Sequence, residues 1–166
     1  MAKILSALEV GPKFSSVFSY DAVYYNSSLQ YAMEICGTDF QNLNLKESEK
    51  GNLLASLKIM HSFNICHFDI KVDNIGWSEA YKKLIFFDFG MTEVVDAPQG
   101  FKTKTNFKGT YSFCSPEMKK LYHLKTHSFV DAYYNDLHCL QFSWAQINSI
   151  RLGPNLEFQR DDFRLR

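Results

Sequence analysis

HFDIKVDN, at residues 67–74, is the stretch of sequence that decides the fold. Two further segments follow it along the chain, DFG at 88–90 and GTYSFCSPE at 109–117. Asp69 and Asn74 stand five residues apart in the first segment, a spacing that suits a loop turning both side chains into one cleft. The apolar run LIFF at 84–87 predicts a short strand that delivers Asp88 directly after it.

These residue types meet the needs of phosphoryl transfer, which depends mostly on positioning and on charge neutralisation. One carboxylate must accept the proton of the attacking hydroxyl, hard oxygen ligands must hold Mg²⁺, and a cation must stabilise the developing charge. Asp69, Asn74, Asp88 and Lys71 supply such groups. The plainer interpretation stays open, because Asp and Asn are common turn formers and a Lys in a polar loop is often simply solvated.

In this order the three segments resemble the catalytic loop, the metal-binding turn and the end of the activation segment of protein kinases. The resemblance implies that Asp69 is the catalytic base and that Lys71 contacts the γ-phosphate. Asn74 and Asp88 would bind Mg²⁺, and ATP and Mg²⁺ would be the cofactors. Lys71 together with Thr110 implies transfer to Ser or Thr of a protein substrate.

The resemblance extends to both sides of these segments and covers roughly residues 1–150. Asp136, in DLHCLQ, resembles the F-helix Asp that hydrogen-bonds the catalytic-loop backbone, and this form of the motif leans slightly toward the casein-kinase-1-like branch. MEIC at 33–36 resembles the gatekeeper and hinge, so Glu34 and Cys36 would hold adenine through their backbone groups. Structural roles are implied for Leu5, His67, Phe89, Gly90, Thr110 and Glu117.

The expected fold class is therefore α+β: a protein-kinase-like fold, mainly the helical C-lobe with a remnant N-lobe. Residues 1–36 would be the N-lobe remnant and hinge, 37–150 the C-lobe core, and 151–166 a charged tail. Hydrophobic periodicity and turn signals give the expected elements. They are a helix at 3–8, a hairpin of 17–25 and 29–35, a helix from a capping box at Asn44 and Glu47 to Asn64, strands at 75–77 and 83–87, a long loop at 91–115, a short helix after Pro116 and a long helix at 131–149.

Several family features have no counterpart in the sequence. It contains no G-x-G-x-x-G loop and no V-A-I-K strand Lys, and Met1 aligns where the ion-pairing Glu of the C helix would stand. Only a short tail follows the F-helix segment, so Glu117 is expected to lack its usual buried Arg partner. Phe68 replaces the catalytic-loop Arg that receives an activating phosphate, so Thr103 and Thr105 are poor candidates for activation by that route.

Four functions follow as alternatives. The chain is a Ser/Thr protein kinase segment whose other parts lie elsewhere, a pseudokinase-like binding module, a fragment without function or, less favoured, a small-molecule phosphotransferase. The last is disfavoured because the GTYSFCSPE segment is of the kind that presents a peptide.

Composition limits the partners. Eighteen Lys and Arg balance eighteen Asp and Glu, which gives no basic field for nucleic acid and no polybasic membrane patch. No secretory leader, membrane span or zinc-type cysteine spacing is visible, so an intracellular, cytoplasmic protein is expected. Fifteen Phe predict core and interface, with exposed apolar surface available to a partner chain. The histidines other than His67, namely His61, His123, His127 and His138, show no ligand spacing and receive no role.

Overall fold

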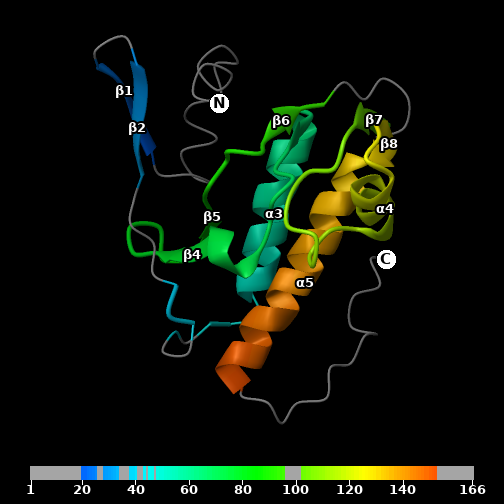
Figure 1. Ribbon diagram of the computed structural model, residues 1–166. Coiled ribbons are helices and arrows are strands. Elements are labelled where there is room, and N and C mark those ends of the chain that lie inside the picture. The colour runs from blue at the N-terminus through cyan, green and yellow to red at the C-terminus, as the bar shows by residue number, and fades with distance from the viewer. Residues whose placement is uncertain are drawn as a thin grey trace.

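The computed structural model describes residues 20–25, 28–33, 38–40, 43, 45–46, 48–95 and 102–152 of the chain. Within these ranges the structure has four two-stranded antiparallel sheets, and the β1–β2 hairpin stands apart from the helices (Figure 1). The elements in chain order are β1 Tyr20–Tyr25, β2 Ser28–Met33, α3 Ser48–Ser62, β3 Ile65–Cys66, the 3₁₀ turn η1 Val72–Asn74, β4 Ile75–Ser78, β5 Lys83–Phe86, β6 Glu93–Val94, β7 Lys102–Thr105, α4 Pro116–Leu124, β8 Ser128–Asp131 and α5 Ala132–Leu152. No helix among the described residues is long and apolar enough to cross a membrane.

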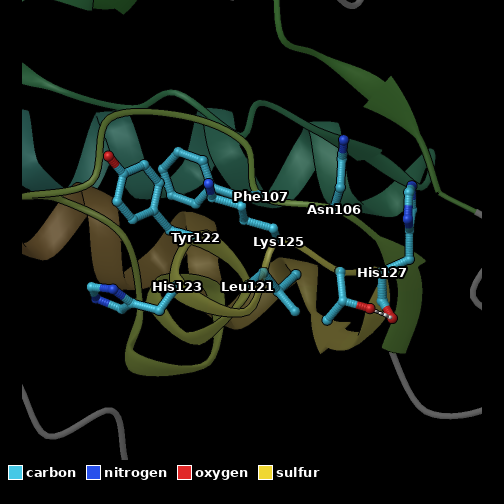
Figure 2. A pocket seen from close by; sticks show the side chains of 8 residues that line it. Asn106, Phe107, Leu121, Tyr122, His123, Lys125 and His127 are labelled. Carbon is cyan, nitrogen blue, oxygen red and sulfur yellow. Dashed lines mark hydrogen bonds between the residues drawn. The ribbon is translucent and has the colours of Figure 1, made fainter.

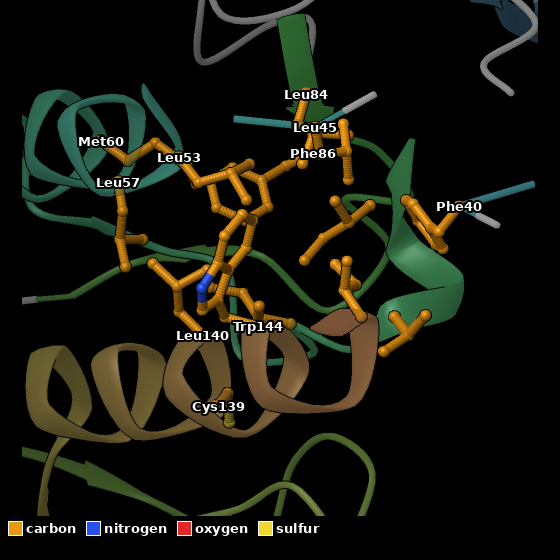
Figure 3. Packing of buried hydrophobic residues seen from close by; sticks show 14 of the residues in the cluster. Phe40, Leu45, Leu53, Leu57, Met60, Leu84, Phe86, Cys139, Leu140 and Trp144 are labelled. Atoms are coloured by element: carbon orange, nitrogen blue, oxygen red, sulfur yellow. The ribbon is translucent and has the colours of Figure 1, made fainter. Parts of the chain in front are cut away.

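The main hydrophobic core lies between α3 and α5, which run side by side in Figure 1. Leu53, Leu57 and Met60 recur at helical spacing, and all three are fully buried on one face of α3. Trp144 projects from α5 into the space between the two helices (Figure 3), and Phe86 of β5 packs in the same cluster. Burial of side chains this large makes α3, β5 and α5 one packed unit.

A second, smaller cluster joins the segment after α3 to α4 and β8. Its buried members are Cys66, Phe68, Val95, Cys114, Met118, Leu121, Val130 and Ala132. Phe68 belongs to this cluster, whereas its near neighbour Ile70 belongs to the main core. The loop at 67–74 is therefore anchored in both cores at once.

Most of the expected elements are confirmed. The first hairpin pairs Tyr20 with Met33 and Tyr25 with Ser28, and β4 and β5 form the second hairpin. Helix α4 begins with Pro116 at its first turn, after Ser115, whose hydroxyl caps it by accepting from the Met118 N–H. The helix expected at 3–8, Leu5, Glu34, Cys36, Asn44, Glu47 and the tail from 153 onward lie outside the described residues.

Two expectations are wrong. The helix expected to start at the Asn44 capping box begins only at Ser48, because Leu45 and Lys46 are not helical. Its first turn is held instead by Glu49, whose buried carboxylate accepts a 3.2 Å hydrogen bond from the backbone N–H of Leu84. The second error is the uninterrupted loop at 91–115, which contains β6 and β7; β7 pairs with β8 from a distant part of the chain.

Candidate active site

The Asp69 carboxylate is the centre of a polar cluster built by the 67–74 loop and by Thr110. The Thr110 hydroxyl donates to Asp69 Oδ1 at 2.8 Å. Lys71 Nζ lies 3.2 Å from Asp69 Oδ2 and donates to Thr110 Oγ1 at 3.3 Å. Asn74 Nδ2 donates to the Asp69 backbone carbonyl at 2.8 Å and to Oδ2 at 3.2 Å. The side chains of Asp69 and Lys71 remain 13% and 23% exposed, so this cluster is ordered but open to solvent.

The backbone of the loop explains why these polar groups converge. The side chains of Ile70, Val72 and Ile75 are buried in the core and hold the loop against it. The turn η1 then reverses the chain through the hydrogen bond from the Asn74 N–H to the Lys71 carbonyl, 2.9 Å long. The apolar residues thus face the core while Asp69 and Lys71 face out of it.

Asp136 of α5 supports the loop from the protein interior. Its carboxylate is fully buried and accepts the backbone N–H groups of His67 and Phe68 at 2.7 and 2.9 Å. Phe68 has a φ of +64°, a conformation that a bulky residue adopts only when its surroundings impose it. Two charge-assisted hydrogen bonds to one carboxylate provide that constraint.

His67 is buried and neutral. The Asp69 N–H donates to its Nδ1 at 3.3 Å, so Nε2 carries the ring proton and donates to the Phe87 carbonyl at 3.3 Å. Its ring packs 5.1 Å from that of Phe89. Burial lowers the pKa of His67 below its usual value, against a smaller opposing effect of the Asp136 charge. These contacts place His67 under the loop as a packing and hydrogen-bonding residue.

His61 is a residue that the sequence interpretation missed. Its Nε2 lies 3.2 Å from Asp136 Oδ2, and its ring stacks on Tyr133 with centroids 4.4 Å apart. The Tyr133 hydroxyl in turn donates to Asn64 Oδ1 at 2.7 Å. Ligand spacing could not reveal this role, because His61 and Asp136 are 75 residues apart in the sequence.

Asp88 lies beside the cluster without bonding to it. Its φ is +56° and its side chain is exposed, with Oδ1 accepting from the Gly90 N–H at 3.2 Å. No hydrogen bond or ion pair joins Asp88 to Asp69, Lys71 or Asn74 among the described residues. The link runs through the backbone, where the Phe87 N–H donates to the Asn74 carbonyl at 3.0 Å.

The oxygen donors of Asn74 and Asp88 are of the type that magnesium prefers. Mg²⁺ prefers carboxylate and carbonyl oxygens. The amide nitrogen of Asn74 is committed to Asp69, which leaves its oxygen available for a cation, and Asp88 contributes an exposed carboxylate. Asn74 and Asp88 are therefore the residues that could hold the ion.

The segment from Gly109 to Glu117 is fastened to the loop and to α5. Gly109 has a φ of +87°, and a Cβ built on it would lie 2.1 Å from the Phe68 carbonyl oxygen. The Ser115 N–H donates to Oδ1 of the buried Asn135 at 3.0 Å. Like the contact of His61 with Asp136, this hydrogen bond was not predicted from the sequence. Glu117 does not present the expected problem of a buried carboxylate without a partner, because it is exposed and accepts the Asp131 N–H at 3.3 Å.

Phe68, which stands in place of an arginine, has a cationic neighbour. Lys108 Nζ lies 5.4 Å from the centroid of the Phe68 ring and forms an ion pair with Glu93. Thr105 is buried in β7, and Thr103 in the same strand is half-buried. A lysine paired with Glu93 therefore lies over the Phe68 ring.

Together the loop, its buried Asp136 support and the Thr110 contact form one polar site on an α+β fold. A model of the protein kinase domain family matches residues 17–133, and the chain belongs to the protein kinase family.

Two similar proteins are a kinase with a short stretch of similar sequence and a kinase with a similar fold. Calcium-dependent protein kinase 6 of Plasmodium berghei (strain Anka) is 36% identical over 69 residues, which are 41% of this chain and 4% of that protein. The structure of the PK-1 kinase of Cydia pomonella granulovirus matches with a TM-score of 0.53 at 20% identity, over 86% of this chain and 51% of that one. The chain thus spans a small part of the first relative and about half of the second. The structural match shows the protein-kinase-like fold.

Proposed function

We propose that this chain carries the catalytic loop of a Ser/Thr protein kinase, which transfers the terminal phosphoryl group of ATP to a protein hydroxyl. The observation that supports the proposal most is the convergence of Thr110, Lys71 and Asn74 on the Asp69 carboxylate. A carboxylate fixed by three partners is oriented in advance to accept a hydroxyl proton, and positioning supplies much of the rate enhancement in this chemistry.

Each residue has a separate part in the proposed reaction. Asp69 accepts the proton of the attacking hydroxyl, and Lys71 neutralises charge on the transferred group. Asn74 and Asp88 would hold Mg²⁺, which would supply positive charge that neutralises the phosphates. The backbone of Glu34 and Cys36 would hold the adenine.

The same proposal includes the division of the chain. Residues 37–150 would be the C-lobe core, 1–36 a remnant of the N-lobe with the hinge, and 151–166 a tail. A glycine-rich loop and a strand lysine would come from another part of the protein or from a partner chain. The substrate would be an intracellular protein, because members of the protein kinase family are typically intracellular.

A second candidate is a binding module that does not transfer phosphate. One observation favours it: the printed sequence contains neither a G-x-G-x-x-G loop nor a V-A-I-K lysine, and each of these positions phosphate in active kinases. The polar cluster would then serve a nucleotide or Mg²⁺ contact without turnover.

A direct assay separates the two candidates. The purified chain is incubated with Mg·ATP and a generic Ser/Thr protein substrate, beside the variants Asp69→Asn and Asp88→Asn and the exposed control Asp73→Asn. Phosphate transfer that falls by roughly 100-fold or more in both site variants but not in the control supports the kinase. A folded chain that transfers no phosphate, yet is stabilised against heat by Mg·ATP, supports the binding module.

A further inference from the structure

A hollow of about 480 Å³ lies beside the C-terminal half of α4, and none of its lining residues belongs to the Asp69 cluster. Phe107, from the segment after β7, meets Tyr122 and the buried Leu121 of α4 there. Lys125 and His127 complete the lining on the side of the α4–β8 connection. Figure 2 shows the Phe107 and Tyr122 rings next to each other, with His127 at the opposite end of the hollow. Its volume is in the range of sites that bind small molecules or peptide side chains.

The aromatic side of the hollow is held by its own ring contacts. The rings of Phe107 and Tyr122 meet edge to face with centroids 5.0 Å apart, and the ring of Tyr111 lies 5.1 Å from that of Tyr122. The Tyr111 hydroxyl and His123 Nε2 share a hydrogen bond 2.8 Å long. Tyr122 nevertheless remains 53% exposed. An apolar surface that is already fixed loses little side-chain freedom when a ligand covers it.

The described lining of the hollow carries a formal positive charge and no formal negative one. Lys125 is the formal cation of the lining, and the imidazoles of His123 and His127 stand beside it. No carboxylate occurs among the lining residues that the structure describes. Within that part of the chain, the side chain of Lys125 takes part in no ion pair. The whole chain has a formal charge of zero, so this corner is more cationic than the average surface.

Two large apolar side chains that are close in sequence to the lining residues, but do not line the hollow, are also exposed. Leu124, on the last turn of α4, is 67% exposed, and Phe129 of β8 is 64% exposed. Within the lining itself, the exposed ring of Tyr122 and the cation of Lys125 occur together. This combination favours a partner that carries both apolar and acidic residues.

We propose that this hollow is a docking site for an acidic peptide segment of a partner protein. An apolar side chain of the peptide packs against Phe107 and Tyr122 over Leu121, and a neighbouring carboxylate pairs with Lys125. Docking needs no phosphoryl transfer, so it stands or fails separately from the proposed kinase activity. If both hold, the site selects proteins that present an acidic segment away from the hydroxyl to be phosphorylated.

Fluorescence polarisation without ATP tests the proposal on the full chain. The probe is a short fluorescein-labelled peptide in which a Phe-Leu pair is flanked by aspartates, and it is compared with the same peptide carrying asparagines or lysines in their place. We expect saturable binding of the aspartate peptide, weaker binding of the asparagine peptide and none of the lysine peptide. Added salt should weaken the binding, because it screens the charge attraction.

Matched variants locate the binding. Tyr122→Ala should raise Kd about tenfold or more, as the loss of an aromatic anchor does. Lys125→Asn should raise it about threefold to fivefold, and asparagine tolerates the left-handed backbone found at this position, where φ is +49°. The controls Tyr81→Ala and Lys58→Asn change exposed residues of the same types outside the hollow and should leave Kd unchanged.

Three outcomes would overturn the proposal. They are equal binding of the aspartate and lysine peptides, a Kd that neither Tyr122→Ala nor Lys125→Asn changes, and no binding of any peptide by a chain that unfolds cooperatively. Self-association of the chain that Tyr122→Ala abolishes would assign the hollow to a second copy and would also overturn it. Loss of phosphate transfer alone would not bear on it.

Discussion

Asp136 holds His67 through a 2.7 Å hydrogen bond from the histidine backbone N–H to a fully buried carboxylate. The other carboxylate oxygen accepts the N–H of Phe68, and His61 adds a third contact at the first oxygen. The buried charge is therefore compensated from two segments of the chain. The conformation of the loop that carries Asp69 depends on this one side chain of α5.

Replacing Asp136 should consequently destabilise the whole protein. Asp136→Ala leaves two buried N–H groups without an acceptor, and we expect the free energy of unfolding to fall by about 3–5 kcal/mol. Asp136→Asn keeps one acceptor oxygen and should cost less, about 1–3 kcal/mol. Urea unfolding followed by circular dichroism measures both, with the exposed Asp73→Asn as the control. A loss below 1 kcal/mol in Asp136→Ala would show that the loop does not rely on this support.

Two glycines should respond to alanine in opposite directions. Gly109→Ala places a Cβ 2.1 Å from the Phe68 carbonyl oxygen at a φ of +87°, and we expect a loss of at least about 3 kcal/mol. Gly51→Ala lies within α3 with nothing within 4 Å of the added Cβ. Alanine there should raise the free energy of unfolding by about 0.5–1 kcal/mol. Thermal unfolding of the two variants in one buffer provides the comparison, and equal effects would contradict it.

Acid should weaken the fold through His67. Burial lowers the pKa of His67 in the folded protein. Between the lowered native pKa and the usual value, the imidazole is therefore protonated in the unfolded chain and neutral in the folded one. The contribution of His67 to the free energy of unfolding is therefore fully present above the usual histidine pKa of 6.5. It falls as the pH drops from there toward the lowered native pKa. The slope is at most about 1.4 kcal/mol per pH unit for this one group.

Urea unfolding at several pH values between about 7.5 and 5.5 measures this slope. His67→Gln should flatten it, whatever its effect on the absolute stability. His138, whose pKa burial also lowers, contributes with the same sign, so some slope should remain in the variant. An unchanged slope in His67→Gln would mean that His67 does not titrate differently in the two states.

Thr110 offers a test of the polar cluster that separates the hydroxyl from the side-chain shape. Thr110→Val removes the donor to Asp69 Oδ1 and the acceptor of Lys71 while keeping the volume. If the chain is the proposed kinase, phosphate transfer should fall roughly tenfold or more, since Asp69 loses its orientation. Thr110→Ser, which restores the hydroxyl, should recover most of the activity. Equal activity in both variants would rule out the hydroxyl contact as a positioning element.

The sequence was sufficient to predict those parts whose signal is local. The helical spacing of Leu53, Leu57 and Met60 predicted the helix that is α3. Pro116 predicted the start of α4. The order of the three motif segments was enough for the kinase-like fold. The polar cluster around Asp69 involves residue types that the motif already names, although its contact with Thr110 crosses 41 residues.

What the sequence could not predict depends on distant partners. The Asn44 and Glu47 pattern looked like a helix start, but the contact between Glu49 and the Leu84 N–H fixes the first turn of α3 later in the chain. Strand β7 has the polar sequence KTKT, which shows no apolar alternation, and it becomes a strand by pairing with β8. The role of His61 could not be predicted from a local motif, because its partner Asp136 is 75 residues away in the sequence.

The distance in sequence between His67 and Asp136 also delays the contact between them during synthesis of the chain. The two residues are 69 positions apart, so a ribosome adding about 5–20 residues per second needs roughly 3–14 seconds to pass from one to the other. During that interval the His67 and Phe68 amides lack the Asp136 carboxylate as their acceptor. A chain interrupted between residue 74 and α5 would carry every residue of the HFDIKVDN motif and still lack the Asp136 carboxylate that holds the backbone of the motif in place.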